Sequence, residues 1–77
     1  MSGSEHLVRM ANDIGNFFES EGDRDAAIAG IAAHIRRFWE PRMRRKIYAH
    51  LDAGGEGLGD LPRAAIRQLA EKESAAN

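Results

Sequence analysis

The chain has 77 residues and a net charge of −1, with 12 acidic residues, 11 lysines and arginines, and no cysteine. A chain of this length is expected to form a single domain, and the lack of cysteine excludes a disulfide framework and a cysteine-based zinc site. No apolar stretch approaches the roughly 20 residues that a membrane span requires. We therefore expect a cytoplasmic protein that does not enter a membrane.

The first predicted helix covers about residues 4–20, where apolar side chains recur at helical spacing. Gly22 is expected to end this helix, because glycine readily adopts the left-handed conformation found at helix C-termini. Asp23 is expected to cap the next helix, since its carboxylate can accept a hydrogen bond from an unpaired backbone N–H.

The second predicted helix covers residues 24–39 and is apolar on two sides. One side carries bulky residues, namely Ile28, Ile31, Ala32, Ile35, Phe38 and Trp39. The other side is flat and is formed by Ala26, Ala29, Gly30 and Ala33. A helix that is apolar all round is normally buried all round. In a chain this small, the flat side is expected to contact a partner.

A proline break is predicted next, because the residue before Pro41 avoids helical geometry. A third helix is predicted over residues 41–52, followed by a glycine-rich stretch that reads as a flexible linker or, alternatively, as a backbone contact for a partner. A fourth helix is predicted over residues 61–71, with a flexible tail over residues 72–77. The predicted fold is an all-α bundle of three to four short helices.

Catalytic and metal sites are not supported by the sequence. The three histidines show no metal-ligand spacing, and the glycine-rich stretch lacks the pattern of a phosphate-binding loop. Four short helices also offer few walls for a buried catalytic pocket. We expect no catalytic, cofactor-binding or metal-binding residues and no enzymatic activity of the chain itself.

The most distinctive segment is basic. Residues 34–50 carry a net charge of +5, whereas residues 1–25 carry −4 and residues 51–77 carry −2. A solvated charged face, a nucleic-acid site, a membrane anchor and a protein interface are all conceivable. The acidic flanks disfavour nucleic acid, and the few apolar residues after Pro41 disfavour a membrane surface. Arginine and tryptophan are enriched at the centres of protein interfaces, so we favour a protein partner.

Two long stretches resemble a known family. LVRMANDIGNFFES (residues 7–20) and GIAAHIRRFWEPRMRRKIYAHLDAGGEGLGDL (residues 30–61) resemble the delta subunit of soluble, NAD-dependent, molybdenum-containing formate dehydrogenases. The chain departs from the family's sequence pattern at Asp13, where glutamine is expected, and at Glu40, where aspartate is expected. Neither change affects the predicted helix–proline–helix arrangement.

The resemblance implies a non-catalytic accessory-subunit domain over residues 1–77 that binds the catalytic alpha subunit, in a complex that also contains beta and gamma subunits. It implies that bis-molybdopterin guanine dinucleotide, iron–sulfur clusters, FMN and NAD are held by the other subunits. A transient chaperone for cofactor insertion and a small nucleic-acid-binding protein remain alternatives. Phe38 and Met43 are expected in the core. The predicted partner-binding residues are His34, Arg36, Arg37, Trp39, Arg42, Arg44 and Arg45, with Ala26, Ala29, Gly30 and Ala33 as the flat face.

Overall fold

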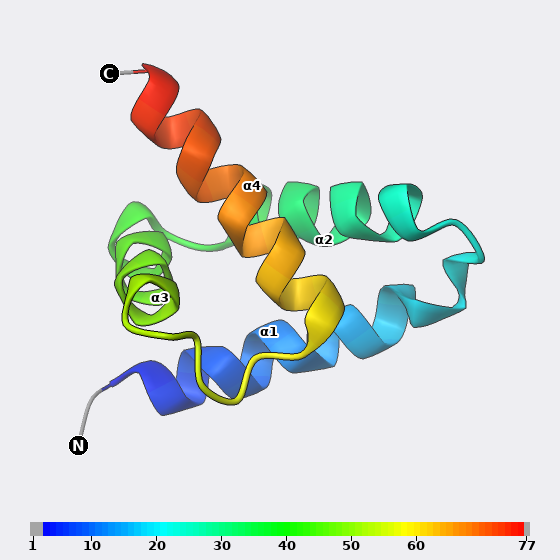
Figure 1. The fold of residues 1–77 in the computed structure, drawn as a ribbon, viewed down its shortest axis with the longest axis horizontal. Coiled ribbons are helices and arrows are strands. Elements are labelled where there is room, and N and C mark those ends of the chain that lie inside the picture. The colour runs from blue at the N-terminus through cyan, green and yellow to red at the C-terminus, as the bar shows by residue number, and fades with distance from the viewer. Residues whose placement is uncertain (1–2, 77) are drawn as a thin grey trace.

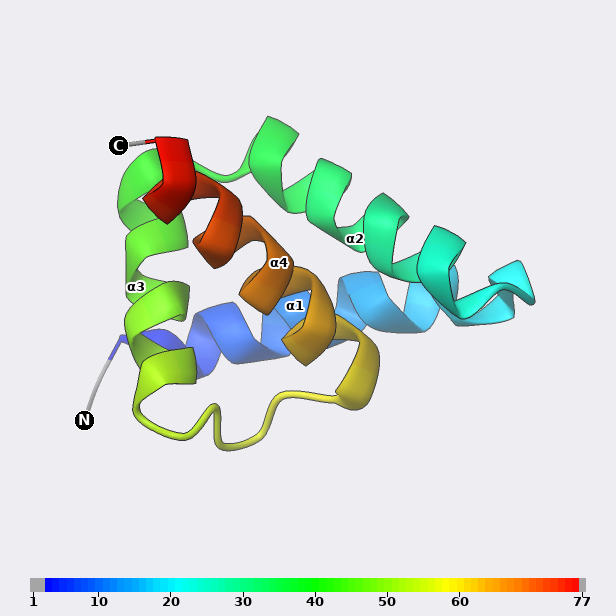
Figure 2. The ribbon, with the colours of Figure 1, turned by 45° about the horizontal axis from the view of Figure 1, so that its top comes forward.

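The computed structural model describes residues 3–76, and within that range the fold is all-α, as predicted. Its elements, in order, are α1 (Ser4–Phe18), the 3₁₀ turn η1 (Glu19–Glu21), α2 (Arg24–Phe38), α3 (Pro41–Asp52) and α4 (Asp60–Ala76). Helix α4 packs against each of the other three helices (Figure 1). In the tilted view of Figure 2, α4 lies between α2 and α3 and passes over α1.

The core is built from one stripe of each helix. Leu7 and Ala11 come from α1, Ile47 comes from α3, and the remaining buried apolar residues lie mainly on α2 and α4. The largest fully buried side chains among the described residues are Ile31, Ile35, Ile47 and Ile66. The bulky stripe of α2 therefore faces α4 and α1, which leaves the alanine side of α2 outside the core.

The helix boundaries follow local chemistry. Gly22 has a positive φ of 83°, and the Asp23 side chain accepts a hydrogen bond from the Asp25 N–H at 3.3 Å, which caps α2 as predicted. At the other end of α2 the backbone becomes extended at Trp39 and Glu40. Pro41 then occupies the first turn of α3, where its missing N–H is not needed.

Helix α4 is longer than the sequence pattern predicted. It begins at Asp60 and continues to Ala76, through most of the residues that were expected to form a flexible tail, while Asn77 lies outside the described residues. A contact far along the helix accounts for the extension, because Glu73 receives a hydrogen bond from Arg44 on α3. The sequence alone does not show that Arg44 contacts Glu73, so it could not tell a helical end that packs on α3 from a flexible tail.

The glycine-rich stretch between α3 and α4 is a fixed loop and not a free linker. The Asn12 side chain donates to the Gly57 carbonyl at 2.9 Å and accepts from the Gly59 N–H at 2.8 Å. Arg63 donates to the Gly55 carbonyl at 2.9 Å, and Leu58 is buried in the core. Because these partners come from α1 and α4, the loop joins segments that are distant in sequence.

Gly15 offers a test of how closely α1 approaches α4. A Cβ atom at Gly15 would lie 2.6 Å from Cγ of Pro62, whose ring cannot swing aside. Overpacking costs about 1–3 kcal/mol, whereas replacing a helical glycine by alanine gains about 1 kcal/mol. We expect Gly15→Ala to lower the unfolding free energy in a urea titration.

The exposed neighbour Asn16 serves as the control for this experiment, and we expect Asn16→Ala to change the unfolding free energy by no more than about 0.5 kcal/mol. A Gly15→Ala protein that is more stable than the original chain would contradict the close approach of the two helices.

Candidate functional site

The junction between α2 and α3 gathers most of the positive charge. We use the term basic junction for the cations on either side of Pro41, namely Arg36, Arg37, Arg42, Arg44, Arg45 and Lys46. The extended backbone at Trp39 and Glu40 turns the chain between the two helices, and Arg44 of α3 reaches back to the Arg36 carbonyl at the end of α2. All of these side chains except Arg44 belong to exposed residues.

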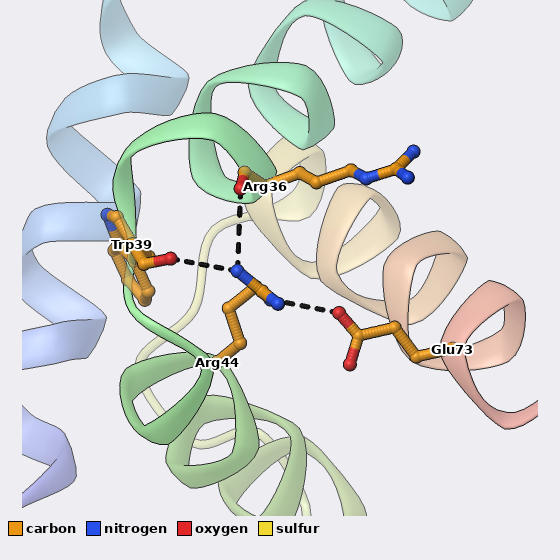
Figure 3. Close-up of polar contacts among 4 residues, drawn as sticks. All are labelled: Arg36, Trp39, Arg44 and Glu73. Carbon is orange, nitrogen blue, oxygen red and sulfur yellow. Dashed lines mark hydrogen bonds and ion pairs between the residues drawn. The ribbon is translucent and has the colours of Figure 1, made fainter.

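Arg44 is used inside the fold. Its Nη1 donates to the Trp39 carbonyl at 2.8 Å and to the Arg36 carbonyl at 3.4 Å, and its Nε donates to Glu73 Oε2 at 2.9 Å (Figure 3). The side chain is only 17% exposed. Arg44 therefore caps the end of α2 and ties α2, α3 and α4 together. A residue predicted as a partner contact thus holds the junction in shape.

Tyr48 lies beside this cluster. Burial raises the pKa of Tyr48 to about 12, the nearby Glu73 carboxylate acts in the same direction, and Arg44 opposes the rise. The phenol is therefore neutral at physiological pH. It adds no negative charge to the junction, whose exposed cations keep their excess of positive charge.

The burial of the two aromatic side chains, Phe38 and Trp39, is the reverse of what the sequence predicted. Phe38, expected in the core, is 64% exposed, whereas Trp39, predicted as a partner contact, is 4% exposed and belongs to the core. Met43 packs against the core as a half-buried residue. His34 lies against the Phe38 ring with centroids 4.7 Å apart, and the Arg37 guanidinium lies 5.7 Å from the same ring. Phe38, His34 and Arg37 thus form one surface patch.

The flat face of α2 is mostly at the surface. Ala26, Ala29 and Ala33 are exposed, while Gly30 is covered by the Phe18 ring, which leaves no room for a Cβ atom. The three alanines are therefore exposed, and their contact with a partner stays a prediction. Gly30 serves a contact within the chain.

A groove of about 410 Å³ runs between α2 and α4 beside this face. On α2 it is lined by Ala29, Ala32, Ala33, Arg36 and Arg37, and on α4 by Gln68, Leu69 and Lys72. The α4 residues were missed by the sequence prediction, which placed Lys72 in a flexible tail. The spacing from Leu69 to Lys72 is one helical turn, and this is the signal that could have placed both residues on one side of α4.

An ion pair lies at the opposite end of α2 from the basic junction. Arg24 donates to the Asp60 carboxylate at the start of α4, and the two groups are well exposed to solvent. Hydrogen bonding and attraction to Arg24 hold the pKa of Asp60 below its usual range. This pair joins α2 to α4 at the other end of α2 from the basic junction, where Arg44 is the cation that pairs with Glu73.

Other kinds of site were sought in the same residues. Within the described range, no group of three or more histidine or acidic side chains is placed to hold a metal ion. None of the helices in that range has both the length and the hydropathy of a membrane span.

The described residues thus define a small all-α protein whose surface combines an alanine face, an exposed phenylalanine and a cluster of cations. The family model of the NADH-dependent formate dehydrogenase delta subunit, FdsD, matches residues 6–66. The match covers well over half of the chain, so the chain belongs to this family, and the resemblance drawn from the sequence is confirmed. No curated protein and no solved structure matched the chain. Members of the family are subunits of a multi-subunit formate dehydrogenase.

Proposed function

We propose that this chain is a non-catalytic accessory subunit that binds the molybdenum-containing catalytic alpha subunit of an NAD-dependent formate dehydrogenase. The observation that carries the proposal is the exposed patch at the end of α2. Phe38, His34 and Arg37 lie together there, and Arg42 and Arg45, on the helix that follows, are also exposed. A large exposed aromatic side chain among arginines is typical of interface centres and is unfavourable in water.

The shape of this surface supports the same proposal. Ala29 and Ala33 have short side chains, so another backbone can approach α2 closely along the flat face. Arginine forms paired hydrogen bonds with carboxylates and also stacks on aromatic rings, which suits it to a protein interface better than lysine. Arg44 and Trp39 act beneath this surface by fixing the turn from which the exposed cations project.

The benefit of docking would be stability of the loaded enzyme. In this proposal the bis-molybdopterin guanine dinucleotide, the iron–sulfur clusters, FMN and NAD reside on the other subunits, including beta and gamma subunits. A subunit that binds the cofactor-loaded alpha subunit more tightly than the empty one stabilises the loaded form by mass action. Assembly, cofactor retention and complex stability all follow from that preference.

Charge reversal tests the docking surface. We expect Arg37→Glu combined with Arg42→Glu to reduce capture of the catalytic subunit at least about tenfold in a pull-down, because like charges then face an acidic partner. The matched control is Arg9→Glu combined with Arg67→Glu, which reverses two exposed cations outside the junction. Undiminished capture by a double variant that still shows the helical far-UV spectrum would rule out this surface.

Two rival functions can be separated by purification and binding. A transient chaperone would bind only the empty alpha subunit, so recovery of the chain with mature, cofactor-loaded enzyme would argue against it. A nucleic-acid-binding protein would bind duplex DNA or RNA at low salt, where phosphate contacts are strongest. We expect the chain to remain with the loaded enzyme and to show no such nucleic-acid binding.

A further inference from the structure

The groove between α2 and α4 has a polar rim of one sign. Arg36, Arg37 and Lys72 line it, and no acidic side chain does. None of these three cations forms a salt bridge within the part of the chain that the structure describes. The ion pairs of the fold lie elsewhere, at Arg24 and at Arg44.

Apolar side chains also line the groove. The methyl groups of Ala29 and Ala33 line it on α2, and Leu69 lines it on α4. Charges beside low-dielectric walls produce a stronger local potential than the same charges spread over an open surface. A ligand for this groove should therefore carry carboxylates for the cations and aliphatic groups for the alanine and leucine side chains.

We propose that this groove binds an acidic segment of the catalytic subunit, with aliphatic side chains against Ala29, Ala33 and Leu69 and carboxylates at Arg36, Arg37 and Lys72. The inference deepens the proposed function and rests on it, since it specifies the chemistry of the partner segment. It also adds residues of α4 to the docking surface, whereas the surface at the α2–α3 junction includes none. A polypeptide fits better than a nucleic acid, because a phosphate backbone offers no aliphatic group for the apolar lining.

Lys72 provides a test that is separate from the junction. We expect Lys72→Glu to raise the dissociation constant for the catalytic subunit by about tenfold. The control is Arg67→Glu, which makes the same charge change on an exposed residue of α4 that lies outside this groove. We expect the control to bind within about twofold of the original chain, because an exposed charge distant from an interface is screened by salt.

The outcomes distinguish the inference from the proposed function. If the Arg37/Arg42 double reversal abolishes capture while Lys72→Glu binds like Arg67→Glu, the groove is empty in the complex and the inference fails alone. If neither reversal affects capture, the inference and the proposed docking surface fail together. Binding of duplex DNA at low salt that is lost in Lys72→Glu would also overturn the inference.

Crosslinking identifies the occupant. The chain has no cysteine, so Gln68→Cys introduces a single thiol in the groove, which can be labelled with benzophenone maleimide before the chain is mixed with the catalytic subunit. After irradiation, we expect mass spectrometry to locate the crosslink in a segment of net negative charge. Arg67→Cys, labelled in the same way, should not crosslink to that segment. A crosslink to a basic segment, or to a second copy of this chain, would overturn the inference.

Discussion

Trp39→Ala is expected to lower the unfolding free energy by about 3–5 kcal/mol, the usual cost of removing a buried aromatic side chain. The indole is 4% exposed and belongs to the same core cluster as Ile35 and Ile47. Small domains are typically stable by about 5–15 kcal/mol, so much of the chain would be unfolded at room temperature in the least favourable case. Urea titration followed by far-UV circular dichroism measures the loss without depending on tryptophan fluorescence.

The adjacent residue is the matched control. Phe38 is 64% exposed, so we expect Phe38→Ala to change the unfolding free energy by no more than about 0.5 kcal/mol. Phe38→Ala should instead weaken capture of the catalytic subunit. Trp39→Phe should leave that capture unchanged as long as the chain folds. Equal destabilisation by the two alanine substitutions would contradict the positions described for these rings.

Arg44→Met is expected to lower the unfolding free energy by about 1.5–3 kcal/mol, the range measured for hydrogen bonds that involve a charged group. The substitution keeps much of the aliphatic stem but removes the donors to the Trp39 and Arg36 carbonyls and to Glu73. Arg44→Lys should recover only part of the loss, since an ammonium group cannot reproduce the planar fork of donors.

Arg45 is the natural comparison, because it is the next residue on α3 and is exposed. We expect Arg45→Met to leave the thermal midpoint nearly unchanged, whereas Arg44→Met should lower it by several degrees. If the two variants melt at the same temperature, the hydrogen bonds of Arg44 contribute nothing measurable to the fold.

Local signals were sufficient for much of the fold. The Asp23 cap, the left-handed Gly22 and the break at Pro41 each depend on the conformational preferences of one or two residues, and the structure reproduces all three. The bulky stripe of α2 was also predictable, since helical periodicity alone places Ile28, Ile31 and Ile35 on one side.

Periodicity failed where the helix ends. A helical wheel cannot predict where the Trp39 side chain points, because the backbone at Trp39 has left the helix and is extended, with ψ at 137°. Phe38, the last helical residue, points to solvent, and Trp39 turns inward. The places of these two rings were therefore set by a backbone change that a helical wheel does not represent.

Charge pattern could not tell which cations are used internally. Arg44 and Arg45 look alike in sequence, and only the approach of α4 brings Glu73 within 2.9 Å of Arg44. The same long-range approach creates the groove and places Lys72 beside Arg36 and Arg37. Both features join residues more than 25 positions apart in the chain, beyond the reach of any local rule.

The groove has a consequence for biosynthesis, because its two walls come from distant parts of the chain. Residues 29–37 leave the ribosome well before residues 68–72, so the cationic groove exists only after α4 has been synthesised and has folded back onto α2. A nascent or prematurely truncated chain would present the alanine face of α2 without the second wall. Assembly through this groove would therefore select chains in which α4 is present and folded.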